Sequence, residues 1–168
     1  MDLGTGDGRA VLAAARRDPT RLYIGIDANL DGLAQASTRA SRRPERGGAA
    51  NAWFVRASAE CLPPELDGLA CGVTVLLPWG SLLDAVLRPD VDVLRGIRRL
   101  CAPGAAIEVV VSLEASRDGA AADLGAPSVA RLRSPYRAAS LDLRSVQALD
   151  RAALAATGTT WAGRLAHG

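Results

Sequence analysis

Residues 2–8 read Asp-Leu-Gly-Thr-Gly-Asp-Gly and run directly into an apolar, helix-forming stretch that starts at Arg9. Three glycines at alternate positions predict a tight turn that lets a ligand approach the backbone. In doubly wound α/β proteins such a turn follows the carboxyl end of a buried first strand. Here Met1 stands where the last apolar residues of that strand belong, and the chain stops at Gly168 without a final apolar run. We therefore expect a fold that lacks its first and last strands, as in a fragment or a trimmed chain.

Outward from this turn, short β-branched runs alternate with helical stretches rich in Ala, Leu and Arg. This alternation is typical of βαβ units and predicts a mostly parallel, doubly wound α/β sheet of the Rossmann-like kind. The 168 residues, 49% of them hydrophobic, are enough for a single domain with its own core. We expect strands over residues 22–27, 52–56, 73–77, 107–112 and 146–149, helices over residues 9–17, 30–42, 81–100 with a break at Pro89, 129–139 and 151–156, and a flexible loop over residues 117–127.

Composition excludes several kinds of protein. The chain has no apolar run of about 18 residues, and its start does not resemble a signal peptide, so a cytoplasmic location is the default. Three cysteines at unpaired spacings and one histidine, His167, argue against a zinc site, a disulfide framework and a Cys-His nucleophile. We expect no metal.

The glycine-rich turn and the acids near it indicate the ligand. Its spacing is GxGxG, whereas the dinucleotide fingerprint is GxGxxG. Asp2, two residues before the first glycine, suits the cationic aminopropyl end of S-adenosylmethionine and would repel a pyrophosphate. Asp27 ends the second predicted strand, where a carboxylate can accept both ribose hydroxyls. We therefore predict a class I S-adenosylmethionine-dependent methyltransferase, with cofactor contacts from Asp2, Gly4, Thr5, Gly6, Asp27, Ala59, Glu60 and Leu76.

Two tryptophans are candidates for binding an acceptor. Trp79 comes just after the fourth predicted strand, in the turn Leu77-Pro78-Trp79-Gly80, where it can stack on a flipped base or close the core from above. Trp161 stands in the tail with Arg164, and together the two tryptophans could sandwich a planar base while Arg164 meets a phosphate.

Trp53 lies inside a predicted strand, and we expect it in the core. Glu60 follows the third strand and is either a cofactor contact or a surface acid capping the Pro63-Pro64 turn.

All 20 basic residues are arginine, against 18 acidic residues, which gives a net charge of +2. The arginines gather in two segments, residues 39–56 and 131–164, that could converge on a phosphate backbone. Ordinary solvated helix faces remain the alternative.

Several motifs together resemble one family. They are the glycine-rich turn, Tyr-Ile-Gly-Ile-Asp at 23–27, Arg-Pro-Glu-Arg-Gly-Gly at 43–48, Ala-Glu-Cys-Leu-Pro at 59–63, Pro-Trp-Gly-Ser-Leu-Leu at 78–83 and Trp-Ala-Gly-Arg-Leu at 161–165. Over nearly the whole chain they resemble the Kam-type aminoglycoside-resistance ribosomal RNA methyltransferases, although residues 117–137 match weakly. The resemblance implies methylation of N1 of the decoding-site adenine, nucleotide 1408 of 16S rRNA, in the small ribosomal subunit, with aminoglycoside resistance as the result. A monomer is the simplest fit to docking on a subunit.

The resemblance also implies roles for individual residues. Trp79 and Trp161 would be the base-stacking residues, and Thr159 would supply a hydroxyl facing the cofactor. Arg42, Arg43 and Arg46 would form an RNA-docking loop, and Arg164 would help to hold the flipped nucleotide. Two alternatives stay open: a class I methyltransferase of a small molecule or protein, and an inactive truncated remnant.

Overall fold

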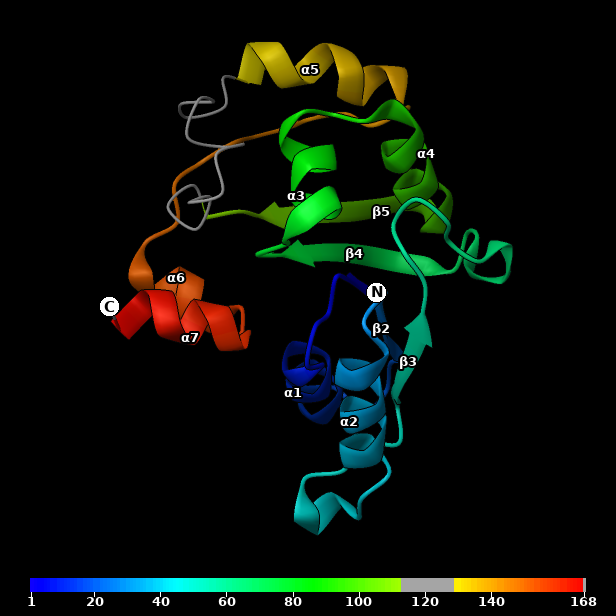
Figure 1. Cartoon of the computed structure of the whole chain (residues 1–168), viewed down its shortest axis with the longest axis vertical. Coiled ribbons are helices and arrows are strands. Elements are labelled where there is room, and N and C mark those ends of the chain that lie inside the picture. Colours follow the sequence, from blue (N-terminus) through cyan, green and yellow to red (C-terminus); the bar gives the residue numbers. More distant parts are fainter. Residues whose placement is uncertain (113–128, 168) are drawn as a thin grey trace.

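The computed structural model describes residues 1–112 and 129–167, without the side chains of Val129, Trp161, Arg164, Ala166 and His167. Within this part of the chain, five strands form one sheet in the order β3-β2-β1-β4-β5, and every pair of neighbours is parallel (Figure 1). The predicted doubly wound α/β fold is confirmed. The strands are β1 (Asp2–Leu3), β2 (Tyr23–Asp27), β3 (Ala52–Arg56), β4 (Ala70–Leu76) and β5 (Cys101–Val110).

Strand β1 lies at the centre of the sheet although it has only two residues. Asp2 pairs with Gly25 of β2 on one side and with Thr74 of β4 on the other, and Leu3 pairs with Ile26. A short strand therefore occupies the position in which we expected none. It delivers the chain directly into the glycine-rich turn at residues 4–8.

Helices cover both faces of the sheet. Because side chains alternate along a strand, Ile24 and Ile26 of β2 face one side and Tyr23 faces the other. The first face packs against α3 (Gly80–Leu87) and α4 (Val91–Leu100), and the second against α1 (Arg9–Arg17) and α2 (Leu30–Ala40). The remaining helices are α5 (Val129–Ala138), α6 (Arg151–Ala156), α7 (Thr160–His167) and the short 3-10 helices η1 (Pro44–Arg46) and η2 (Pro64–Leu66).

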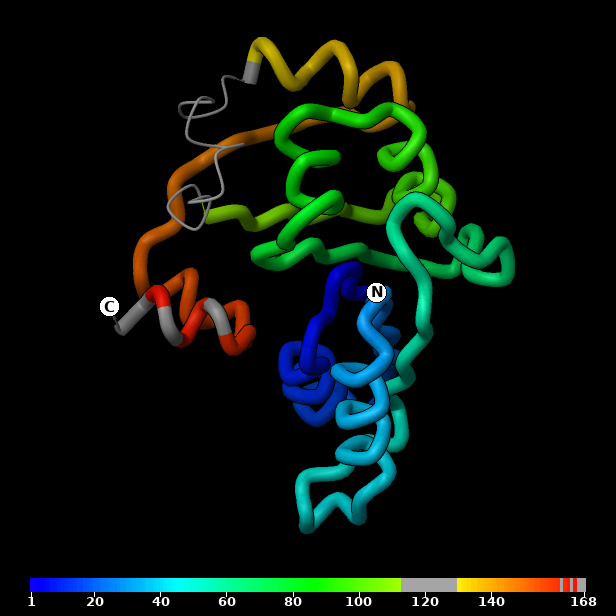
Figure 2. Tube along the Cα trace, in the orientation of Figure 1, coloured from blue at the N-terminus to red at the C-terminus, as the bar shows by residue number. Residues whose placement is uncertain are grey.

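Helix boundaries follow local chemistry. Asn29 begins α2 and Asp90 begins α4, and each side chain accepts hydrogen bonds from backbone N–H groups of the first turn. Asp90 follows Pro89, so the predicted break at that proline is confirmed. The C-terminal part of the chain departs more from expectation, since α7 was not predicted (Figure 2).

Two sequence predictions about packing were wrong. Residues 146–149 form no strand, and Val146 and Leu149 are largely exposed because no described strand lies beside them. Trp53 is 60% exposed rather than buried. Its neighbours Ala52 and Phe54 face the core under α1 and α2, so Trp53 points to the opposite face of the edge strand β3. After β3 the chain forms only η2 before β4, and this short turn does not cover Trp53. The predicted loop at residues 117–127 lies outside the described residues.

Candidate functional site

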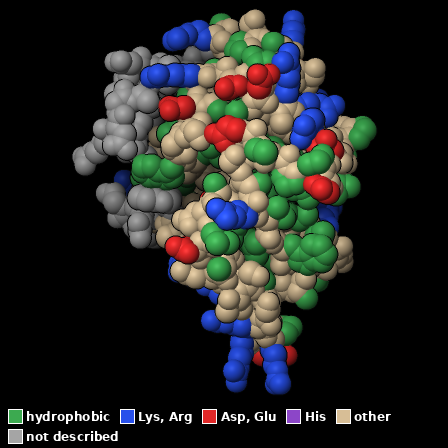
Figure 3. Space-filling view, turned by 45° about the vertical axis from the view of Figure 1, so that its right-hand side comes forward, with side chains coloured by type: hydrophobic (Ala, Val, Ile, Leu, Met, Phe, Trp, Pro, Cys, Tyr) green, Lys and Arg blue, Asp and Glu red, His purple; other side chains and the backbone are tan. Residues whose placement is uncertain are grey.

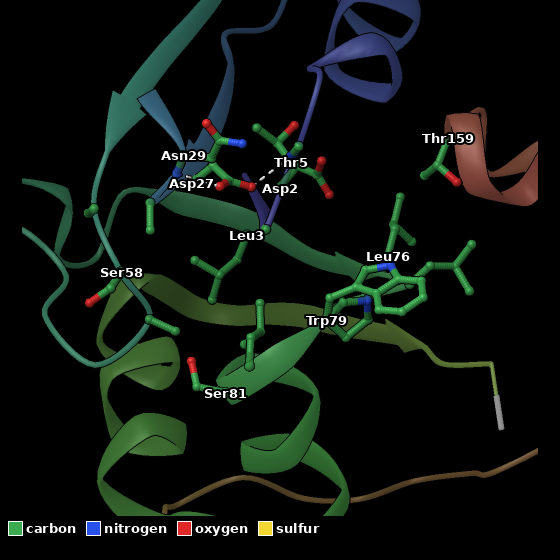
Figure 4. A pocket seen from close by; sticks show the side chains of 18 of the residues that line it. Asp2, Leu3, Thr5, Asp27, Asn29, Ser58, Leu76, Trp79, Ser81 and Thr159 are labelled. Carbon is green, nitrogen blue, oxygen red and sulfur yellow. Dashed lines mark hydrogen bonds between the residues drawn. The ribbon is translucent and has the colours of Figure 1, made fainter. Parts of the chain in front are cut away.

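A cavity of about 460 Å³ opens at the carboxyl ends of the strands. It lies where the strand order reverses between β1 and β4, the position at which open α/β sheets bind ligands. Its volume is in the range of small-molecule sites. The structure brings to its lining all the residues predicted to contact the cofactor, together with Trp79: Asp2, Gly4, Thr5, Gly6, Asp27, Ala59, Glu60, Leu76, Thr159 and Trp79 (Figure 4).

The glycine-rich turn forms one wall of the cavity. Gly4, Gly6 and Gly8 all have positive φ angles, of 76°, 57° and 69°, which a residue with a side chain adopts only with strain. A Cβ on Gly8 would also lie 2.5 Å from Ala36 and 2.6 Å from Phe54. The turn is attached to β2, because Gly4 N donates to Ile26 O at 2.8 Å. This geometry leaves the backbone of the turn open to the cavity.

Asp27 holds the turn from the end of β2. Its Oδ2 accepts a hydrogen bond from Gly6 N at 2.7 Å, and its Oδ1 accepts one from Asn29 N at 2.8 Å. Each carboxylate oxygen can accept more than one hydrogen bond, so capacity remains for a ligand. Asp27 therefore has a structural role that the sequence analysis did not foresee.

Asp2 places a buried carboxylate at the base of the cavity. It is 7% exposed, and burial raises the pKa of its carboxyl group, although the Thr74 hydroxyl donates to Oδ1 at 2.7 Å and acts in the opposite direction. A buried carboxylate is costly unless it is paired. Asp2, Asp7, Asp27 and Glu60 all line the cavity, and no arginine does so among the described residues. The cavity therefore favours a ligand with positive charge.

Glu60 lies on an exposed part of the cavity rim. Hydrogen bonding from the Ser81 hydroxyl holds the pKa of the Glu60 carboxyl below its usual range. Ser81 belongs to the first turn of α3, so this contact joins the segment after β3 to the element that follows Trp79.

A strained turn presents Trp79 beside the cavity. Leu77 has a φ of 52° although it is a bulky residue, and its N–H donates to Val110 O at 2.7 Å. Such strain persists where the surrounding structure enforces it, often at functional sites. Trp79 is 44% exposed, so it does not close the core. Its ring lies next to Leu76 and across the cavity from Asp27 and Ser58 (Figure 4).

Helix α7 forms the remaining side of the cavity. Thr159 lines the cavity, and its hydroxyl accepts a hydrogen bond from Ala162 N at 2.9 Å, which caps the helix. Trp161 and Arg164 belong to α7, but their side chains lie outside the described residues, so the predicted stacking partner of Trp79 is not placed.

The predicted RNA-docking arginines lie elsewhere. Arg42, Arg43 and Arg46 are exposed on and around η1. Arginine side chains gather at the narrow lower end of the molecule, which this segment forms (Figures 1 and 3). None of the three lines the cavity.

Sequence analysis missed several lining residues. Asn29 could have been found, because a helix cap two residues after Asp27 must lie at the same strand end. The contact between Asp7 and Thr160 could not, since it joins segments 153 residues apart: Thr160 Oγ1 donates to Asp7 Oδ2 at 2.7 Å. The missed lining residues that carry polar side chains are Asp7, Asn29, Ser58, Ser81 and Thr160.

Two further observations concern the whole described chain. No helix in residues 1–112 and 129–167 is long and apolar enough to cross a membrane. The same residues contain no group of three or more His, Cys, Asp and Glu side chains arranged to hold a metal ion.

Comparison with known proteins gives consistent matches. A profile of the family described as NpmA, 16S rRNA (adenine(1408)-N(1))-methyltransferase, matches residues 1–168. A 16S rRNA (adenine(1408)-N(1))-methyltransferase of Escherichia coli is 35% identical over 176 residues, covering 100% of this chain and 80% of the relative.

Solved structures agree with these sequence matches. That of the aminoglycoside resistance methyltransferase NpmB1 is 46% identical, with a TM-score of 0.77 over 90% of this chain and 80% of the other. The W203A mutant of the 16S rRNA (adenine(1408)-N(1))-methyltransferase from Catenulisporales acidiphilia, solved with its cosubstrate SAM, is 30% identical, with a TM-score of 0.83 over 98% of this chain and 77% of the other.

Proposed function

Since the chain belongs to the 16S rRNA (adenine(1408)-N(1))-methyltransferase family, we propose that it methylates N1 of adenine 1408 in the small ribosomal subunit, with S-adenosylmethionine as methyl donor. One observation carries the proposal. An acidic cavity at the strand-order reversal has Trp79 on its rim, so a cationic donor and a planar acceptor can be held side by side.

The residues of the cavity fit S-adenosylmethionine. This cofactor carries an ammonium group and a sulfonium, which match a lining with four carboxylates. Thr5 Oγ1 is buried without a hydrogen-bond partner among the described residues, and a polar ligand group would satisfy it. A structural relative has been solved with this cosubstrate. We assign Asp2 to the ammonium group and Asp27 to the ribose hydroxyls, with Gly4, Thr5, Gly6, Ala59, Glu60, Leu76 and Thr159 completing the site.

For methyl transfer to adenine N1, the main task of the protein is to position the base and the methyl donor. When bound, the cofactor supplies an electrophilic methyl group on its sulfonium. Adenine N1 carries a ring lone pair, so it can attack that methyl group without first losing a proton, and the reaction needs neither a catalytic base nor a metal. The rate then comes from holding N1 close to the methyl group at a productive angle.

Trp79 and Trp161 hold the base in this proposal. A methylated N1 leaves the adenine cationic, and each aromatic face stacked on it stabilises that charge by about 0.5 to 2 kcal/mol. Arg164 meets the flipped nucleotide, and Arg42, Arg43 and Arg46 contact RNA away from the cavity.

A monomer acting in the cytoplasm is the simplest arrangement for docking on a ribosomal subunit, and no membrane takes part. A positively charged decoding-site base would repel cationic aminoglycosides, and the cell would then be resistant.

Primer extension tests the proposal. Small ribosomal subunits incubated with the protein and S-adenosylmethionine are copied by reverse transcriptase, which stops at an adenine methylated on N1. We expect a donor-dependent stop at nucleotide 1408, absent when the donor is omitted. The absence of a stop with cofactor binding intact would point to a small-molecule or protein acceptor, and the absence of both to an inactive protein.

A further inference from the structure

One hydrogen bond links the two ends of the candidate site. Thr160 Oγ1, at the first position of α7, donates to Asp7 Oδ2 in the glycine-rich turn at 2.7 Å. Both residues line the cavity. We propose that Thr160 and Asp7 are positioning residues, which hold α7 in place over the cofactor so that Trp161 meets the target base. This inference rests on the function proposed above.

Asp7 is a well-fixed anchor. Its Oδ1 accepts a hydrogen bond from Arg9 N at 3.2 Å, and Arg9 Nε lies 3.3 Å from its Oδ2. Its main-chain oxygen accepts a hydrogen bond from Arg39 Nη1 of α2 at 3.1 Å. Arg9 therefore orients the Asp7 carboxylate and Arg39 holds its main chain, so Thr160 bonds to an acceptor that is already oriented.

Helix α7 needs such an anchor. It has eight residues and its neighbour α6 has six, and helices this short are not stable without tertiary contacts. Ala162 is fully buried against Leu77 and Val110, which seats α7 on the ends of β4 and β5. This packing, which also involves Leu165, sets which face of α7 is buried. The bond from Thr160 adds a directional contact to the cofactor-side turn at the start of the helix, one residue before Trp161.

The shared anchor has a consequence for binding. Asp7 belongs to the turn that carries the cofactor contacts Gly4, Thr5 and Gly6. A ligand that orders this turn favours the Asp7 position to which α7 is bonded, and a base held by α7 favours the same position in return. The bond therefore couples occupation of the cofactor site to the placement of the acceptor helix.

Three variants test the inference. Thr160→Val removes the hydroxyl and keeps the shape, and Thr160→Ser restores the hydroxyl. Thr157→Val is the matched control, because the Thr157 hydroxyl bonds to Leu154 O within the same segment and does not reach the turn. For each protein we would measure the Kd of S-adenosylhomocysteine, kcat/KM for small ribosomal subunits, and amide hydrogen exchange in α7 with and without S-adenosylhomocysteine.

We expect kcat/KM of Thr160→Val to fall about tenfold or more, as for loss of a hydrogen bond to a charged acceptor. The Kd should rise only by the factor by which S-adenosylhomocysteine slows exchange in α7 of the wild type, because the coupling between the two is reciprocal. Thr160→Ser and Thr157→Val should match the wild type. In the wild type, S-adenosylhomocysteine should slow exchange in α7, and in Thr160→Val this protection should disappear.

Adding Asp7→Ala to Thr160→Val should cost no more than Asp7→Ala alone, because both changes break the same bond. Additive losses, or unchanged exchange in α7 of Thr160→Val, would overturn the inference. A wild-type protein that fails to methylate the subunit would contradict the proposed function instead, and the exchange comparison would still decide whether the bond positions α7.

Discussion

At the scale of single residues, the buried Asp2 carboxylate lowers the stability of the free protein near neutral pH, while in the proposed function it favours binding of the cofactor. Its carboxylate is buried beside the cavity, and burial raises its pKa above the ordinary value of 3.8. The folded state therefore binds the Asp2 proton more tightly than the unfolded state does. The stability that Asp2 contributes is present below about pH 4 and is lost as the pH rises through the raised pKa.

Asp2→Asn should separate these two effects. The variant has no charge to bury, so the free protein should unfold at a higher temperature than the wild type near neutral pH, and the difference should shrink toward pH 4. Cofactor binding should weaken by about 2 kcal/mol, roughly 30-fold in Kd, because the ammonium group loses its partner. Thermal unfolding across pH and calorimetric titration with S-adenosylhomocysteine check both. Asp92→Asn, at a surface position remote from the cavity, serves as control, and equal affinity in Asp2→Asn and wild type would contradict the assigned role.

Trp79 gives a second prediction at this scale. We expect Trp79→Ala to lower kcat/KM for small ribosomal subunits by about 5- to 150-fold, since stacking on one base contributes about 1 to 3 kcal/mol. The Kd of S-adenosylhomocysteine and the unfolding temperature should change little, because the side chain is 44% exposed. Trp79→Phe should recover part of the activity. Parallel loss of cofactor binding and catalysis would assign Trp79 a structural role.

At the scale of elements, the sequence predicted the bounds of those helices and strands that depend on neighbouring residues. The helices α1 and α6 and the strand β3 have the predicted bounds, because periodicity and helix caps are encoded in neighbouring residues. The prediction that Trp53 is buried was wrong because the pattern of a strand does not say whether its outer face is covered. The prediction of a strand at residues 146–149 was wrong for a related reason. A short apolar run becomes a strand only beside a partner strand, and whether one is present depends on the whole sheet.

In the candidate site too, some features could be predicted from the sequence and others depend on the tertiary structure. The turn at residues 2–8 and Asp27 could be placed together because parallel strands end at one edge of a sheet. The structural use of Asp27 by Gly6 N, and the bond from Thr160 to Asp7, depend on how loops meet in space. Sequence spacing carries no record of such contacts.

The cap of α4 offers a prediction at this scale. Asp90 accepts hydrogen bonds from Asp92 N at 2.9 Å and Val93 N at 3.2 Å. Asp90→Ala should lower the free energy of unfolding by about 1 kcal/mol, as measured by urea denaturation. Asp90→Asn, which keeps an acceptor, should lose less. The Kd of S-adenosylhomocysteine should not change, since α4 does not line the cavity, and a weakened Kd would mean that α4 supports the site.

At the scale of the whole molecule, the acidic cavity and a group of exposed arginines are separated. Four carboxylates line the cavity, while Arg42, Arg43 and Arg46 lie on and around η1 and do not line it. Arginine side chains gather at the narrow lower end of the molecule (Figure 3). This separation suits a protein whose arginines attract a phosphate backbone without competing for a small cation in the cavity.

Replacing these three arginines with glutamine should weaken binding to the ribosomal subunit and flatten its dependence on salt. We expect the slope of log affinity against log salt to fall by about 0.7 to 0.9 for each phosphate that the variant no longer neutralises. A control that makes the same replacements on α4, at Arg95, Arg98 and Arg99, alters net charge equally. Binding measured from low to high salt distinguishes the two, and an equal effect of both triple variants would show that only net charge matters.

The order of the strands also has a consequence for how the protein is made. Strand β1 lies in the middle of the sheet, yet its partner β4 follows about 70 residues later, since Asp2 pairs with Thr74. A ribosome adds roughly 5 to 20 residues each second, so β1 leaves the ribosome about 4 to 14 s before β4 can join it. During that interval β1, β2 and β3 can pair while one edge of the nascent sheet stays open. A pause in translation before residue 70 would prolong the exposure of that edge, and with it the time in which two growing chains could pair with each other rather than with themselves.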